Sequence, residues 1–212
     1  ELIQASQTPV LIVGGGAKFS DAGAAIETFS ERFNIPIVET PTGKSAISSD
    51  FPNNMGGTGI LGTAAANAVI TKADLIIGAG TRYTDFTTAS KTAIHPGKTQ
   101  LININLNRMQ SYKFDAFPIV ADVRDTLSQL TESLSDYRSQ FTDLATIKEA
   151  WQKERQRLAH TNYDAPAYVP EVKNHFDAKT MAAYAEKLQT HLTQTEAVIA
   201  VNNTIDPTSI IG

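Results

Sequence analysis

Residues 9–16 are Pro9-Val10-Leu11-Ile12-Val13-Gly14-Gly15-Gly16, a short apolar run followed directly by three glycines. A run that is apolar at every position is typical of a strand buried on both faces of a parallel sheet. The glycines allow a tight turn toward a helix, which we expect to begin at Ser20 or Asp21 because both are good N-cap residues. The stretch therefore predicts an α/β protein in which strands alternate with helices.

Further apolar runs outside this stretch have the same character. Because strands and helices alternate along the chain, the pattern predicts a three-layer αβα, Rossmann-like parallel sheet with right-handed crossovers and helices on both faces. A ligand crevice is expected where the carboxyl ends of the strands meet. The further strands are expected at 35–38, 74–80, 100–105 and 117–122, and the helices at 64–71, 123–137 and 143–160.

The pattern changes after residue 160. Pro166 and Pro170 break any helix and predict a linker. A helix is expected at 178–191 and a strand at 197–201, and we interpret both as the beginning of another fold unit. No initiator Met opens the chain, and residues 202–212 stop inside an unfinished pattern, so we expect both ends to be cuts in a longer protein. The expected domains are 1–160, a linker at 161–177, and 178–212.

Composition argues against several classes of site. The chain has 212 residues and a net charge of −4, without the clustered Lys and Arg that nucleic acid or an anionic membrane would need. It contains no cysteine, so it has no disulfide and no thiolate ligand or nucleophile, which fits a cytoplasmic protein. No helix carries two histidines at i, i+4, so no zinc pattern exists. The histidines are His95, His160, His175 and His191.

Two features near the first strands suggest nucleotide binding. The glycines at 14–16 suit a phosphate held at a helix N-terminus, but the pattern G-x-G-x-x-G would need glycine at Phe19. Glu39 ends the second strand, about where a ribose-binding acid belongs. A small nicotinamide dehydrogenase is therefore an alternative, and the incomplete glycine motif argues against it.

Two later motifs are ambiguous. The glycine-rich stretch 56–62 is either a ligand-contacting loop or a flexible crossover. Arg82, after the third predicted strand, could bind a phosphate or form a surface salt bridge. Gly43-Lys44-Ser45 is similar to the end of a P-loop, but Val38 stands where that motif begins with glycine.

The order of these motifs resembles the central domain of thiamine diphosphate enzymes, of which acetohydroxyacid synthase is a well-known example. The resemblance extends over about 6–134. Residues 195–203 also resemble the opening strand of the family's third, pyrophosphate-binding domain, which implies that 178–212 is a truncated start of that domain. The matching stretches of the central domain are 9–16, 42–44, 59–63, 66–67, 74–83, 101–105 and 120–123.

Some members of this family hold FAD or ADP in the central domain. Leu61, Thr84, Phe86 and Gln110 replace charged or histidine side chains of the FAD-binding members, and Asn105 replaces a carboxylate. These departures argue against FAD and leave weak binding of an ADP-like ligand as the expectation. The positions that match the family's nucleotide contacts, called here the nucleotide positions, are Gly14, Gly15, Thr40, Gly43, Gly59, Gly62, Gly80, Arg82, Asn105 and Asp122.

Three stretches, 103–109, 151–155 and 174–177, are similar to a hydrolytic member of the family that acts in inositol breakdown. That member opens the ring of a cyclic 1,2-diketone between its carbonyl carbons. The resemblance implies a parent enzyme that uses thiamine diphosphate and Mg²⁺. The glutamate and the Gly-Asp-Gly…Asn motif that serve them in the family lie outside this chain.

We therefore expect no catalytic and no metal-binding residue here, and the chain alone should be inactive. Its expected partners are the other domains of the same parent, which should be a homo-oligomer in the cytoplasm. Two alternatives remain open. One is the FAD- or ADP-binding central domain of an acetolactate synthase-like carboligase, and the other is a structural interaction domain.

Overall fold

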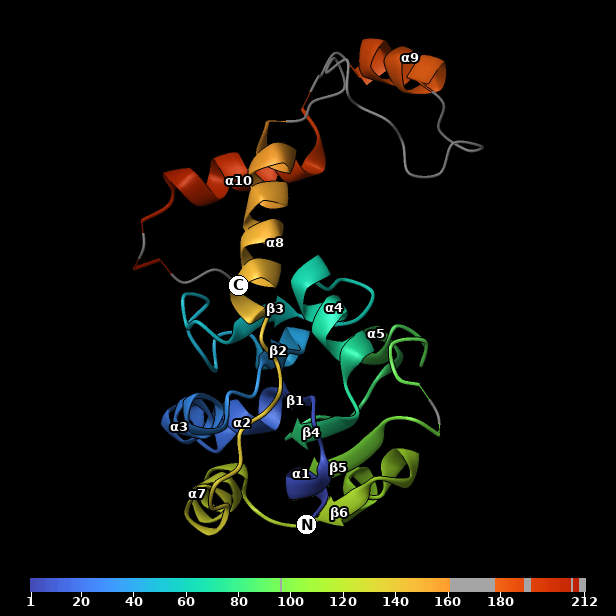
Figure 1. Cartoon of the computed structure of the whole chain (residues 1–212). Coiled ribbons are helices and arrows are strands. Elements are labelled where there is room, and N and C mark those ends of the chain that lie inside the picture. Colours follow the sequence, from blue (N-terminus) through green and yellow to red (C-terminus); the bar gives the residue numbers. More distant parts are fainter. Residues whose placement is uncertain (96, 161–177, 189–191, 207, 210–212) are drawn as a thin grey trace. The chain divides into compact units, whose positions relative to one another are not determined.

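The computed structural model describes residues 1–95, 97–160, 178–188, 192–206 and 208–209 (Figure 1). The chain divides into two compact units, Glu1–Trp151 and Gln152–Gly212. The domain boundaries expected at residues 160 and 177 remain predictions. The predicted linker, with Pro166, Pro170 and His175, lies outside the described residues, as do the end of the predicted helix at 189–191 and His191.

The first unit contains a six-stranded, all-parallel sheet, which confirms the predicted fold class. The strand order is β3-β2-β1-β4-β5-β6. The chain builds the sheet outward from β1 to β3, then crosses back to β4 and builds the other half. The direction therefore reverses between β1 and β4, and this is the switch point at which open parallel sheets bind ligands. The strands are β1 (Pro9–Val13), β2 (Ile37–Glu39), β3 (Asn54–Gly57), β4 (Leu75–Ala79), β5 (Gln100–Ile104) and β6 (Phe117–Ile119).

Strand β1 is apolar throughout because it faces two cores. Leu11 and Val13 belong to one buried cluster, and Val10 and Ile12 belong to the other. The first cluster lies under helices α3 (Gly23–Phe33) and α7 (Val123–Ser133), which pack beside each other on one face of the sheet (Figure 1). The second cluster includes α4 (Ala64–Lys72) and the beginning of α8 (Leu144–Ala159).

The helix after β1 differs from the prediction. The glycines themselves begin a short helix, α2 (Gly15–Phe19), and Ser20 is the residue that ends it. Helix α3 begins after Ala22 without a side-chain cap, and Asp21 has a left-handed φ of 49°. Gly16 N–H donates to Gly80 O over 3.0 Å. This contact with the loop after β4 holds the glycines in place, and the helix begins directly after the strand.

Strand β3 was not predicted. Its residues Asn54, Met55, Gly56 and Gly57 include glycine and asparagine, which are poor strand formers. It forms at the sheet edge because its backbone pairs in parallel with that of β2. The register between the two strands is irregular. The remaining short helices are α1 (Leu2–Ala5), α5 (Asp85–Thr88) and α6 (Arg108–Ser111), with 3₁₀ turns η1 (Pro41–Gly43) and η2 (Lys113–Asp115).

In the second unit, the predicted strand at 197–201 is wrong. These residues lie inside helix α10 (Gln194–Thr204), which follows α9 (Ala178–Leu188). Thr193 caps α10, because its Oγ1 accepts the N–H of Glu196 over 3.1 Å. Thr193 and Glu196 have the spacing of a capping box, and this signal outweighs the short β-branched run that suggested a strand.

Candidate functional site at the carboxyl edge of the sheet

The nucleotide positions all lie in the loops that follow the six strands, so the structure brings them to one edge of the sheet, as the sequence predicted. Gly14 and Gly15 follow β1, Thr40 and Gly43 follow β2, and Gly59 and Gly62 follow β3. Gly80 and Arg82 follow β4, Asn105 follows β5, and Asp122 follows β6. Their role as nucleotide contacts remains a prediction, and the geometry of each loop bears on it.

The loops at the switch point are in direct backbone contact. Gly14 N–H donates to Ala79 O over 2.9 Å, which continues the β1–β4 ladder. A Cβ atom on Gly14 would lie 2.7 Å from the carbonyl carbon of Gly80, closer than real side chains approach. Glycine is therefore required here by the contact between two loops, whether or not a ligand binds.

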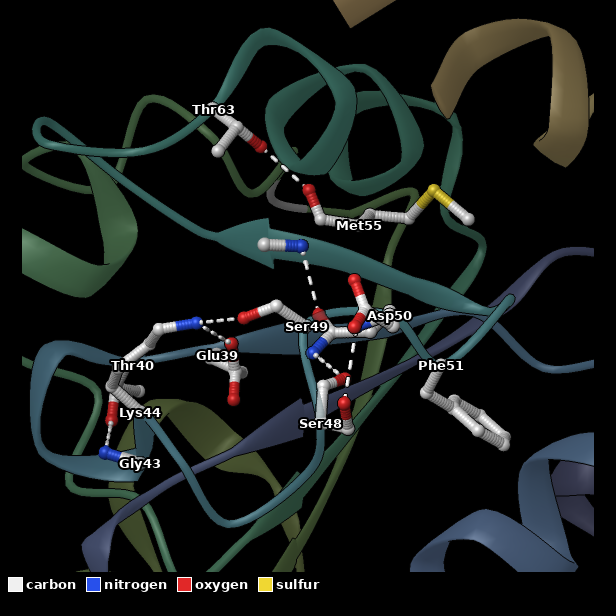
Figure 2. A network of polar contacts seen from close by, with 12 residues as sticks. Glu39, Thr40, Gly43, Lys44, Ser48, Ser49, Asp50, Phe51, Met55 and Thr63 are labelled. Atoms are coloured by element: carbon white, nitrogen blue, oxygen red, sulfur yellow. Dashed lines mark hydrogen bonds and ion pairs between the residues drawn. The ribbon is translucent and has the colours of Figure 1, made fainter. Parts of the chain in front are cut away.

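The loop after β2 is held by Thr40. Its N–H donates to Val13 O over 2.9 Å, and its Oγ1 accepts the N–H of Gly43 over 3.0 Å (Figure 2). Thr40 is thus the N-cap of η1, and both polar groups are used within the protein. The hydroxyl also lies 3.2 Å from that of Thr42.

Glu39, at the end of β2, is fully buried. Its Oε2 lies 3.4 Å from Lys44 Nζ, and that ammonium donates to Ser49 Oγ over 2.6 Å (Figure 2). Its Oε1 has no hydrogen-bond partner among the residues that the structure describes. Lys44, whose motif was similar to a P-loop end, thus pairs with a carboxylate. Glu39 lies where a ribose-binding acid was expected, but it faces a lysine of its own chain.

The last nucleotide positions also have intramolecular partners. Asn105 donates through Nδ2 to Thr81 O over 3.0 Å, and its Oδ1 accepts the N–H of Asn107 over 2.9 Å. Asp122 is the N-cap of α7 and accepts from Ser20 Oγ over 2.7 Å. The Ser20 hydroxyl holds the pKa of the Asp122 carboxyl below its usual value. Arg82 is exposed, and among the described residues no carboxylate forms a salt bridge with its side chain, so its phosphate role stays a prediction.

The loop after β3 is the most constrained. Gly59 has a φ of 91°, and a Cβ there would lie 2.8 Å from the carbonyl carbon of Phe86. Asn67 of α4 holds Gly59 reciprocally, accepting its N–H over 3.0 Å and donating to its carbonyl over 3.1 Å. The 56–62 stretch is therefore not a flexible crossover, which answers one of the alternatives that its composition left open.

Among the described residues, no group of three His, Asp or Glu side chains could hold a metal ion. His95 and His160 are both exposed and stand apart in sequence. We assign no described residue to thiamine diphosphate or Mg²⁺. In the same part of the chain, no helix is long and apolar enough to cross a bilayer.

Two cavities of the first unit lie away from this edge. One, of about 470 Å³, is lined by Gln100 and Phe117, the first residues of β5 and β6, together with Leu2 and Phe114. The other, of about 320 Å³, also includes Gln100. Both cavities therefore open near the amino ends of strands, at the edge opposite the nucleotide positions.

Comparison with known proteins identifies the class. Residues 1–130 match the model of the thiamine pyrophosphate enzyme central domain, and the chain belongs to this family. At the level of individual proteins, it is 56% identical over 212 residues to 3D-(3,5/4)-trihydroxycyclohexane-1,2-dione hydrolase of Listeria innocua. It is 50% identical over 212 residues to the hydrolase of the same name from Bacillus subtilis. Both alignments cover all of this chain but only 33% of the relative. The chain therefore has about a third of the length of these hydrolases.

Proposed function

We propose that this chain is the central third of a 3D-(3,5/4)-trihydroxycyclohexane-1,2-dione hydrolase, which opens the ring of a cyclic 1,2-diketone between its carbonyl carbons during inositol breakdown. The supporting observation is the extent of the similarity. The family model ends at residue 130, whereas the identity of 50–56% to these hydrolases continues over all 212 residues. The alignment with the hydrolases therefore includes the second unit, which a general likeness to the family would not require.

In this proposal the chain is a scaffold within its parent. The parent would be a cytoplasmic homo-oligomer that uses thiamine diphosphate and Mg²⁺, held by residues outside this chain. The described residues supply a rigid parallel sheet with internally bonded loops, and none of them is assigned to the reacting atoms. Residues 178–212 would begin the pyrophosphate-binding domain of the same parent.

A chimaera tests this function. The matching third of the Bacillus subtilis hydrolase is replaced by this chain, and hydrolysis of the trihydroxycyclohexanedione is measured with thiamine diphosphate and Mg²⁺. We expect kcat/KM within about tenfold of the unaltered enzyme, about 1.4 kcal/mol in activation free energy. A matched chimaera that carries the central domain of an acetolactate synthase should be much less active.

Two outcomes would contradict the proposal. The first is a chimaera that melts as the parent does but condenses pyruvate instead of opening the ring. The second concerns the chain alone, which should neither turn over the dione nor bind the cofactor. Stoichiometric binding of thiamine diphosphate and Mg²⁺ to the isolated chain, measured by calorimetry, would remove the scaffold role.

A further inference from the structure

Three large apolar side chains project from the carboxyl edge. Ile60, Leu61 and Phe86 are 56%, 76% and 60% exposed. They lie on two loops, residues 58–63 after β3 and residues 84–88 around α5, that touch through their backbones. Ile60 N–H donates to Phe86 O over 3.0 Å. The two loops are therefore adjacent, and their three exposed apolar side chains are called here the edge surface.

The backbone beneath the edge surface is rigid. Asn67 clamps Gly59 from α4, as described above. Thr63 donates through Oγ1 to Met55 O over 2.6 Å (Figure 2). The same oxygen accepts the N–H of Ala66 over 3.0 Å. A loop fixed in this way cannot fold its apolar side chains back onto the core. It also loses little conformational entropy when something packs on it, which favours binding.

A nucleotide is a poor occupant of this surface. Phosphates bind at loops and helix ends that present free N–H groups, and here four N–H groups of residues 59–63 already donate within the protein. The exposed side chains of Ile60, Leu61 and Phe86 are hydrocarbon, so they offer a phosphate no charge. The donor–acceptor pairs are Gly59 with Asn67, Ile60 with Phe86, Gly62 with Gly59, and Thr63 with Gly57.

We infer that Ile60, Leu61 and Phe86 dock on a segment of the same polypeptide that lies outside residues 1–212. The chain spans 33% of the hydrolases it resembles, so two thirds of a protein of that length lies outside these residues. Exposed apolar side chains on adjacent, hydrogen-bonded loops are typical of such an interface. This inference rests on the proposed function only in requiring a longer parent, and it replaces the predicted nucleotide role of this loop.

Cysteine labelling measures the docking directly, because the chain has no cysteine of its own. Leu61→Cys is labelled with a maleimide in the isolated chain and in the full-length protein, and peptide mass spectrometry follows that position alone. We expect labelling to be slower by about tenfold or more in the full-length protein, because docking must open before the reagent can enter. Gln129→Cys, on the exposed side of α7, is the matched control and should label equally in both.

Equal labelling of Leu61→Cys in both proteins, or equal slowing at both positions, would overturn the inference. Protection of the isolated chain by saturating ADP or FAD would also overturn it, in favour of a nucleotide. As a second readout, Leu61→Ser with Phe86→Ser should leave the melting temperature of the isolated chain unchanged and lower that of the full-length protein. A parent that fails to open the dione ring but protects Leu61→Cys would refute only the proposed function.

Discussion

The hydroxyl of Ser20 donates a 2.7 Å hydrogen bond to the carboxylate of Asp122, across 102 positions of sequence. Ser20 ends α2, and Asp122 caps α7, so the bond joins the loops after β1 and β6. Arg124 N–H donates to the same hydroxyl over 3.1 Å. Asp122, a predicted nucleotide contact, thus holds two helices of one face together.

The first prediction concerns this bond. Asp122→Ala removes the N-cap of α7 and should lower the free energy of unfolding by about 1–2 kcal/mol. Ser20→Ala should also destabilise the chain, and the double variant should lose less than the sum, because the two residues share one interaction. Urea denaturation gives the three values. Glu132→Ala, exposed on α7, is the control and should change stability by less than about 0.5 kcal/mol. Strict additivity would show that the bond contributes nothing.

The second prediction concerns pH. Because the Ser20 hydroxyl depresses the pKa of Asp122 in the folded state, the ionised carboxylate stabilises the fold above its unfolded pKa of about 3.9. This contribution is lost as pH falls through the lower folded pKa. The stability difference between wild type and Ser20→Ala should therefore narrow as acid is added. Urea midpoints measured from neutral pH downward test this, and a difference that stays constant would contradict it.

The third prediction concerns the loop after β3. Gly59→Ala should lower the free energy of unfolding by about 3 kcal/mol, because the residue combines a φ of 91° with a collision against the Phe86 carbonyl. Gly57→Ala is the matched control. A Cβ there meets nothing closer than 3.9 Å, so the change should stay within about 1 kcal/mol. Similar midpoints for the two variants in guanidinium chloride would mean that the loop is not constrained as described.

The fourth prediction concerns the docking of α8. Lys148 Nζ donates to the carbonyl oxygens of Phe51 at 2.6 Å, Pro52 at 3.4 Å and Ser49 at 3.5 Å. Lys148→Met keeps most of the apolar stem of the side chain but removes the charge-assisted bonds, and should cost about 1.5–3 kcal/mol of stability. Lys153→Met, on an exposed position of the same helix, should be nearly neutral. If both variants lowered the melting temperature equally, the loss of stability would come from removing a positive charge and not from the hydrogen bonds of Lys148.

Much of the fold was predictable because burial leaves a local pattern. Strands β1 and β4 are apolar at each position since both of their faces are covered, and the sequence shows this directly. Strand β3 carries no such pattern, and its pairing depends on the backbone of β2. The prediction at 197–201 is wrong for the opposite reason, because the local β-branched run favours a strand, whereas the cap at Thr193 begins a helix.

The sequence by itself determined the fold class, and with it the edge at which the nucleotide positions gather, because the residues after parallel strands must meet at one end of the sheet. Only the tertiary structure decided how those positions are used. Gly14 packs on Gly80, Gly59 packs on Phe86, and Asp122 accepts from Ser20. The partners in each pair lie far apart along the chain, and a local pattern of hydrophobicity contains no information about which distant backbone groups will come within hydrogen-bonding distance.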